Sequence, residues 1–266
     1  MKDKNQWIEV VAFALPLLIA SSLFFSCKQD KLVNDWTRMN LSGYVMTIKE
    51  HSFKAIDTLG EIVQGERMSP SWRRDSYIVF NRAGNKVEEN FYRNDGKMWS
   101  KSVFSYDKNR KKIEEVVYRA DRALWYTKIT RFDSAGHIVE EEMFKPDNSL
   151  GVRMTFVYDG RGNKIEEWKY TDNGKLSIRS VFKYDKNRNK IEEIMYNSEG
   201  GQIVRWVSKY DAKGRQIEED YYNAKNQLEA RETYQYQFDS KGNWIQQIIF
   251  EDDSPKYVIR RELIYY

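Results

Sequence analysis

Cysteine, histidine and proline are scarce in this chain: its 266 residues include one cysteine, two histidines and four prolines. A single cysteine cannot form an internal disulfide, and the two histidines, His51 and His137, are 86 residues apart. The sequence also lacks a phosphate-binding glycine loop, a Cys/His cluster and a Gly-x-Ser-x-Gly motif. These absences predict a protein with no cofactor, no metal site and no catalytic residues.

An excess of one charge is also missing. The 44 Lys and Arg residues are interspersed with 40 Asp and Glu, for a net charge of +4. Nucleic-acid binding uses a basic stripe, so we expect no nucleic-acid partner. The 15% aromatic content, with 18 tyrosines, is high. Because aromatic side chains suit a pleated surface, it favours an all-β fold.

The N-terminal region holds an uncharged 17-residue run, residues 10–26, which precedes Cys27 and contains Pro16. A membrane-spanning helix needs about 20 apolar residues, so the run predicts an export signal, with a simple N-terminal anchor as the alternative. The segment LFFSCKQD at 23–30 resembles the lipobox of bacterial lipoproteins, and its last three letters resemble the export signal of Bacteroidota surface lipoproteins. Ser26 fits the small residue before the cysteine, whereas Phe24 replaces the usual Leu. The resemblance implies lipidation of Cys27, anchoring in the outer membrane of the cell envelope and possible surface exposure.

A repeat fills most of the remaining chain. An aromatic residue followed by Asp or Asn recurs in five steps of 26 residues and one of 28. We number each unit from this aromatic as position zero; position seven is always Ile or Val, and position twelve is always Tyr or Phe. The aromatics are Phe80, Tyr106, Phe132, Tyr158, Tyr184, Tyr210 and Phe238. Position seven holds Val87, Ile113, Val139, Ile165, Ile191, Ile217 and Ile245. Such periodicity predicts a repeat architecture, in which these aromatic and aliphatic side chains form packed ladders from one unit to the next.

Each unit has two turn signals, such as Asp159–Asn163 and Asp172–Gly174, which separate strand-like runs such as Lys164–Tyr170 and Leu176–Tyr184. We therefore expect a meander of about seven β-hairpins, with about fourteen strands. Apolar residues on both strand faces predict a twisted or curled antiparallel sheet that hides one face; whether it closes is left open. The expected organisation is a signal peptide (1–26), a tether with a divergent capping repeat (27–75) and the repeat domain (76–266).

Charge complementarity suggests a register for the hairpins. Folding each hairpin about position fifteen places the Glu at position nine opposite the basic residue at position twenty-one, as for Glu167 and Arg179. It also places position seven opposite position twenty-three, and position twelve opposite the Leu at position eighteen. Opposite charges across strands contribute about 0.2–1 kcal/mol each. The paired Glu residues recur in six units, which favours a structural role over a catalytic carboxylate pair.

The signature at Tyr158–Glu166 resembles the YD repeats of the Rhs family, and the Asn-Gly-Lys-Leu at 173–176 resembles MORN-type hairpin repeats. The resemblance covers about residues 80–266. It implies a hairpin-repeat architecture and specifies no activity.

Residues that break the repeat are the better functional candidates. Trp99 and Trp125 occupy position nineteen of adjacent units, where the later units carry Gly, Ser, Ile and Glu. Two neighbouring tryptophans predict a platform for sugar rings or for an apolar surface of a protein partner; alternatively, they only cap the curled sheet. Further candidate binding residues are Trp168, Trp206 and Trp244.

We thus predict a non-catalytic, lipid-anchored envelope protein whose sheet binds a glycan or a protein. The alternative is an envelope structural or immunity-type protein that sequesters one protein partner, and an enzyme is the third possibility.

Overall fold

The computed structural model describes residues 34–70 and 73–266. Cys27 and the predicted export signal lie outside these described residues. The described chain is all-β apart from one short helix, α2 (Asp35–Arg38). No helix in the described part is long and apolar enough to cross a membrane.

The strands follow the predicted hairpin pattern. The runs expected at 164–170 and 176–184 are β10 and β11, and the all-β meander of hairpins is confirmed. The strands are β1 (Val45–Thr58), β2 (Glu61–Arg67), β3 (Asp75–Phe80), β4 (Lys86–Tyr92), β5 (Met98–Tyr106), β6 (Lys112–Arg119), β7 (Leu124–Phe132), β8 (Ile138–Phe144), β9 (Leu150–Tyr158), β10 (Lys164–Thr171), β11 (Leu176–Tyr184), β12 (Lys190–Asn197), β13 (Gln202–Tyr210), β14 (Gln216–Tyr222), β15 (Leu228–Phe238), β16 (Trp244–Glu251) and β17 (Ser254–Tyr265).

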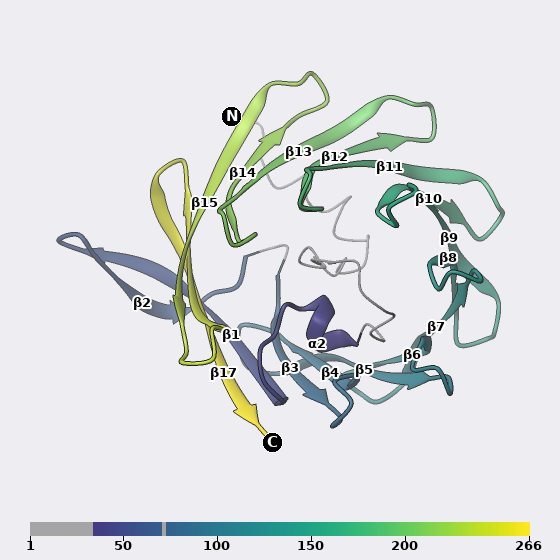
Figure 1. Cartoon of the computed structure of the whole chain (residues 1–266), viewed down its shortest axis with the longest axis horizontal. Helices are drawn as coiled ribbons and strands as arrows, with labels where there is room; N and C mark the ends of the chain where they lie inside the picture. Colours follow the sequence, from purple (N-terminus) through teal and green to yellow (C-terminus); the bar gives the residue numbers. More distant parts are fainter. Residues whose placement is uncertain (1–33, 71–72) are drawn as a thin grey trace.

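The sheet closes on itself (Figure 1). Consecutive strands from β3 to β17 pair in antiparallel fashion, and β1 pairs with both β17 and β3. Because β2 pairs only with the second half of β1, 16 of the 17 strands in the described residues form a closed barrel. The sequence predicted a twisted or curled sheet and left its closure undecided; the structure shows a closed barrel rather than an open curled sheet. The closing strand comes from residues 27–75, and it pairs with both edges that the repeats alone would leave exposed.

Turns at each hairpin use the predicted Asx chemistry. Asp159 Oδ1 accepts hydrogen bonds from the backbone N–H groups of Arg161 and Asn163, at 2.8 and 2.9 Å. Gly162 in the same turn has φ of +78°, a conformation that glycine adopts at low cost. His137 occupies the position of Asn163 in its own unit, where its backbone N–H donates to Asp133 Oδ1.

Helix α2 identifies the inner face of the ring, because it lies inside the ring of strands in Figure 1. Its Trp36 packs against Phe80, and its Asp35 accepts a 2.7 Å hydrogen bond from the Tyr106 hydroxyl. The position-zero aromatics therefore face inward. Their hydroxyls, where present, tie neighbouring hairpins together: those of Tyr184 and Tyr210 each donate to a backbone carbonyl 20 residues earlier, at 2.8 Å.

The hairpin register differs by one residue from the expected pairing. Glu167 lies opposite Ser180, and Arg179 lies opposite Trp168. The physical reason is a β-bulge at position nineteen, here Ser177, which adds one residue to the second strand. The predicted facing of positions twelve and eighteen is correct, as for Tyr170 and Leu176. The register expected for position nine, including Glu141–Arg153, Glu193–Arg205, Glu219–Arg231 and Glu89–Lys101, is wrong in the same way.

A second bulge lies at position seven, where Ile165 is skipped between the pairs Lys164–Tyr158 and Glu166–Val157. Position seven is therefore not opposite position twenty-three, which pairs with the Glu at position eight. Ile113 and Ile217 are 38% and 40% exposed, whereas Ile165 and Ile191 are half-buried. These residues recur at position seven because each strand bends there at a bulge. They do not form a buried ladder.

Charged residues form ion pairs on both faces. On the outer face the basic residue at position twenty-one pairs diagonally with the Glu at position eight, as in Arg179–Glu166 and Arg205–Glu192, both at 2.6 Å. On the inner face the Lys at position six pairs with the Glu at position nine, as in Lys164–Glu167 at 2.6 Å. The Glu residues at positions eight and nine are neighbours in the sequence, but they lie on opposite faces of the sheet.

Candidate functional site

Bulges place Trp99 and Trp125 side by side. Each is the extra residue of its bulge, between the pairs Tyr92–Met98 and Phe91–Ser100 for Trp99, and at the equivalent point of β7 for Trp125. Their ring centroids are 6.0 Å apart with an interplanar angle of 70°, an edge-to-face contact. Because a bulge redirects the side chain of its extra residue, these tryptophans depart from the in-and-out alternation of the strand.

Three arginines surround the two indoles. The guanidinium carbons of Arg74 and Arg93 lie 4.2 and 4.9 Å from the ring centroid of Trp99. The guanidinium carbon of Arg119 lies 5.7 Å from the ring of Trp125. All three arginines are exposed, while the two tryptophans are half-buried. We call these five residues the Trp–Arg site.

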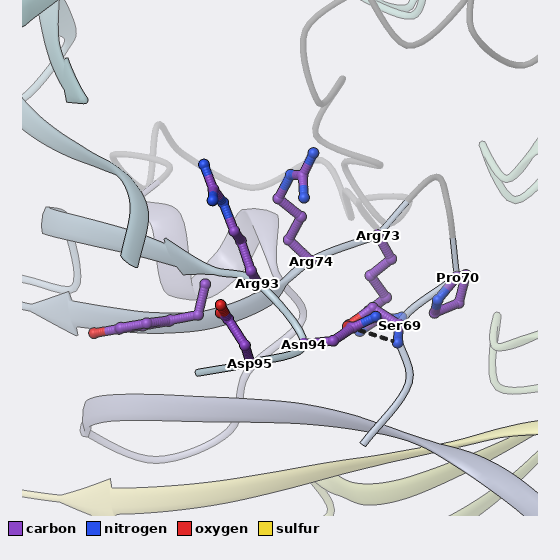
Figure 2. Close-up of a pocket in the computed structure, with 8 residues that line it drawn as sticks. Ser69, Pro70, Arg73, Arg74, Arg93, Asn94 and Asp95 are labelled. Atoms are coloured by element: carbon purple, nitrogen blue, oxygen red, sulfur yellow. Dashed lines mark hydrogen bonds between the residues drawn. The ribbon is translucent and has the colours of Figure 1, made fainter. Parts of the chain in front are cut away.

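A pocket adjoins the Trp–Arg site (Figure 2). It lies between the segment before β3 and the β4–β5 turn, and its volume is about 440 Å³. Figure 2 shows Arg74 and Arg93 extending side by side above it, with Asp95 beside Arg93. Ser69 and Asn94 connect its two walls through a 3.0 Å hydrogen bond. Its lining residues are Ser69, Pro70, Arg73, Arg74, Tyr92, Arg93, Asn94 and Asp95.

The pocket has an excess of positive charge, because three arginines and one carboxylate line it. Within residues 34–70 and 73–266, none of Arg74, Arg93 and Arg119 makes an ion pair with a carboxylate. Partial burial lowers the pKa of the Arg74 guanidinium, and the nearby charge of Arg93 lowers it further. The one lining carboxylate, Asp95, accepts from the backbone N–H of Lys97 and pairs with its ammonium at 3.5 Å.

The other candidate tryptophans lie elsewhere. Trp168, at position ten on the outer face, stacks under Arg179 at 4.8 Å. Trp206, at position twenty-two, faces Glu193 and packs against Tyr221 on the inner face. The ring centroid of Trp244 lies 3.4 Å from the guanidinium carbon of Arg261, near the place where the barrel closes. The structure therefore brings Trp99 and Trp125 together and leaves the other three at separate places.

The histidines do not form a catalytic group with each other. His51 Nδ1 lies 3.3 Å from Asp75 Oδ2, and His137 stacks on Tyr158 with centroids 4.7 Å apart. In the described residues no group of three or more His, Cys, Asp or Glu side chains is arranged to hold a metal ion.

Sequence reasoning missed the arginines of the site, although the repeat contains a signal for two of them. Arg93 and Arg119 occupy position thirteen of the two units that carry Trp at position nineteen. The next four units have Lys, Thr, Asn and Asn at position thirteen. Positions thirteen and nineteen therefore change together, because they flank the same hairpin turn. Arg74 precedes the first unit, and no repeat signal marks it.

Comparison with known proteins identifies a similar fold and no family. No protein-family model and no curated protein sequence matches the chain, so the resemblance to YD repeats stays a prediction. A porin-like protein from Bacteroides uniformis is similar in structure, with a TM-score of 0.55 and 9% identity over 84% of this chain and 98% of that one. A porin-like protein from Bacteroides vulgatus has a TM-score of 0.46 and 8% identity over 84% and 99%. At 9% identity, the likeness to the Bacteroides uniformis protein shows the fold alone. In this chain that fold is a closed antiparallel β-barrel.

Proposed function

We propose that the protein is a non-catalytic, lipid-anchored envelope protein that binds a glycan at the Trp–Arg site. The observation that carries this proposal is the contact between Trp99 and Trp125 beside a pocket. Aromatic side chains with polar neighbours are suited to binding groups that have both apolar and polar surfaces, and sugar rings are such groups.

The dimensions of the pocket favour a small ligand over a protein. Small-molecule sites have volumes of about 300–1,000 Å³, and this pocket, at about 440 Å³, lies within that range. A stable protein interface covers about 800 Å² on each partner, which a pocket lined by eight residues does not supply by itself. Sequestration of a protein remains the second candidate, and it requires additional surface.

Removing both indoles tests glycan binding. In a Trp99→Ala/Trp125→Ala double variant we expect glycan-array binding to fall by about tenfold or more, the usual consequence of losing aromatic anchors. Trp168→Ala is the matched control, because Trp168 also stacks with an arginine but lies on the outer face of β10. A stoichiometric protein partner in pull-down experiments, with no glycan signal, would favour the sequestering function instead.

The outer face supports attachment through a lipid. Ion pairs such as Lys101–Glu88, Arg179–Glu166 and Lys209–Glu218 lie on it, and partly exposed charges of this kind suit contact with water. A lipid on Cys27 would hold the domain at the membrane without requiring its sheet to enter the bilayer. The porin-like proteins with a similar fold come from Bacteroides, which is consistent with a bacterial envelope location.

Fatty-acid labelling tests the anchor. Cells expressing the full chain should incorporate labelled palmitate into it, and Cys27→Ala should abolish the label because it removes the thiol that accepts the lipid. Ser26→Ala serves as the control, because alanine is also a small residue and preserves the cleavage pattern. Unchanged labelling in Cys27→Ala would show that this cysteine is not the lipidated residue.

A further inference from the structure

The geometry points to an acidic glycan as the ligand of the Trp–Arg site: we propose that Arg74 and Arg93 bind an anionic group of a sugar that lies beside Trp99 and Trp125. This inference rests on the proposed function and specifies its substrate class. The anionic group is a carboxylate, as in a uronic acid, or a sulfate.

The positions of the two arginines carry the proposal. Both guanidiniums stack on Trp99, at 4.2 and 4.9 Å, and both line the pocket. An arginine held against an indole keeps its planar set of donors oriented, and it loses less conformational freedom on binding than a mobile one. Planar donors match the two oxygens of a carboxylate, and charge-assisted hydrogen bonds of this kind are about twice as strong as neutral ones.

The contrast with the arginines at position twenty-one strengthens this assignment. Arg153, Arg179, Arg205 and Arg231 of the later units each pair with a Glu or Asp on the sheet. Arg73, next to Arg74, pairs with Glu50 at 2.7 Å. Arg74 and Arg93 form no such pair within the described residues; the charge of Arg93 acts on Arg74 and also on Asp95, whose own ion pair is with Lys97. An anion placed near two like charges relieves their repulsion, whereas a neutral sugar would not.

The repeat pattern also points to this site. Arg at position thirteen and Trp at position nineteen occur together in the two units that start at Phe80 and Tyr106, and in none of the four that follow. The repeat fold therefore tolerates other residues at both positions. Folding of the hairpin, which all units share, does not explain why Arg and Trp occur together in these two units.

Binding measurements on the purified protein test the proposal. We would titrate it with an oligosaccharide of galacturonic acid, the methyl ester of that oligosaccharide, an oligosaccharide whose only charged groups are sulfate esters, and inorganic phosphate. We expect one or both acidic sugars to bind about tenfold or more tightly than the ester, since the ester lacks the charge that strengthens the hydrogen bonds. Their binding should weaken with rising salt. Preference for the uronate or for the sulfated sugar identifies the anionic group.

Variants separate this inference from the proposed function. Arg74→Gln/Arg93→Gln should weaken binding of the acidic sugar by about tenfold or more and remove its advantage over the ester. Arg161→Gln, in an exposed turn elsewhere on the ring, is the control and should bind normally. If the ester binds as well as the acid and only Trp99→Ala/Trp125→Ala reduces binding, the proposed function stands and the acidic specificity is overturned. If no sugar binds, both fail. Phosphate binding as tight as that of the oligosaccharide also overturns the inference.

Discussion

Glu50→Gln is expected to destabilise the protein by about 3–5 kcal/mol, the cost of removing one partner from a buried ion cluster. Glu50 lies on β1 opposite Arg261 of β17 and Ser76 of β3, at the place where the barrel closes. It accepts hydrogen bonds from Arg73 and Arg261, at 2.9 and 2.8 Å. Because Glu50 is only 6% exposed, its loss leaves two arginines without their buried counter-charge.

Urea denaturation at pH 7 measures this effect. Glu66→Gln is the control, since Glu66 is an exposed residue of the neighbouring β2, and exposed substitutions usually change stability by less than about 0.5 kcal/mol. Burial alone would raise the pKa of Glu50, but the charges of Arg73 and Arg261 outweigh it and lower the pKa to about 2. A carboxyl group whose pKa is lowered in the folded state contributes its full stabilisation at pH values above its ordinary pKa of 4.5. The difference between wild type and Glu50→Gln should therefore shrink as the pH falls from 4.5 towards 2. Equal losses for Glu50→Gln and Glu66→Gln at pH 7 would refute the role of the cluster in closure.

Glu232→Gln is expected to stabilise the protein at pH 8, by up to about 3 kcal/mol. Glu232 of β15 lies directly opposite Glu219 of β14 and is 6% exposed. Burial raises the pKa of Glu232 to about 7; a hydrogen bond from the Tyr234 hydroxyl opposes this shift, and the charge of Glu219 adds to it. In the wild type the Tyr234 hydroxyl donates to Glu232 Oε2 at 2.8 Å. Glutamine keeps an oxygen that can accept this hydrogen bond, and it carries no charge.

The sign follows from the direction of the shift. A carboxyl group with a raised pKa favours the folded state fully below its unfolded pKa, near 4.5, and loses this contribution as the pH rises through about 7. Wild type and Glu232→Gln should therefore be about equally stable at pH 4 and diverge towards pH 8. Denaturation at a series of pH values measures the divergence, with Glu229→Gln on the exposed part of β15 as the control. A difference that does not change with pH would contradict the prediction.

Much of the local structure was predictable because it depends on short-range chemistry. The 26-residue period, the Asx turns and the strands of each hairpin follow from residues close in sequence, as at Asp159–Asn163 and β10. The proximity of Trp99 and Trp125 was also predictable, because they occupy the same position in adjacent repeat units. Their edge-to-face contact follows from occupying the same position in adjacent hairpins.

The hairpin register was predicted one residue off because of a bulge. Pairing Glu167 with Arg179 satisfied charge complementarity, but the extra residue at Ser177 shifts the second strand. Diagonal neighbours across strands remain within reach of long side chains, so Arg179 still finds a carboxylate, that of Glu166. Charge complementarity in the sequence therefore identified the type of ion pair correctly but assigned Arg179 to the wrong Glu.

The repeat, its turns and the all-β character follow from the sequence alone, since each unit encodes its own hairpin through contacts within about 26 residues. Closure of the sheet is a property of the folded chain, because it depends on β1 meeting β17 across more than 200 residues, as in Glu50–Arg261. The tertiary structure likewise decided the composition of the Trp–Arg site: Arg74 lies outside the repeat units and reaches Trp99 only through the pairing of β3 with β4 and of β4 with β5. Interactions between distant segments are set by the packing of the whole chain, and no local pattern in the sequence records them.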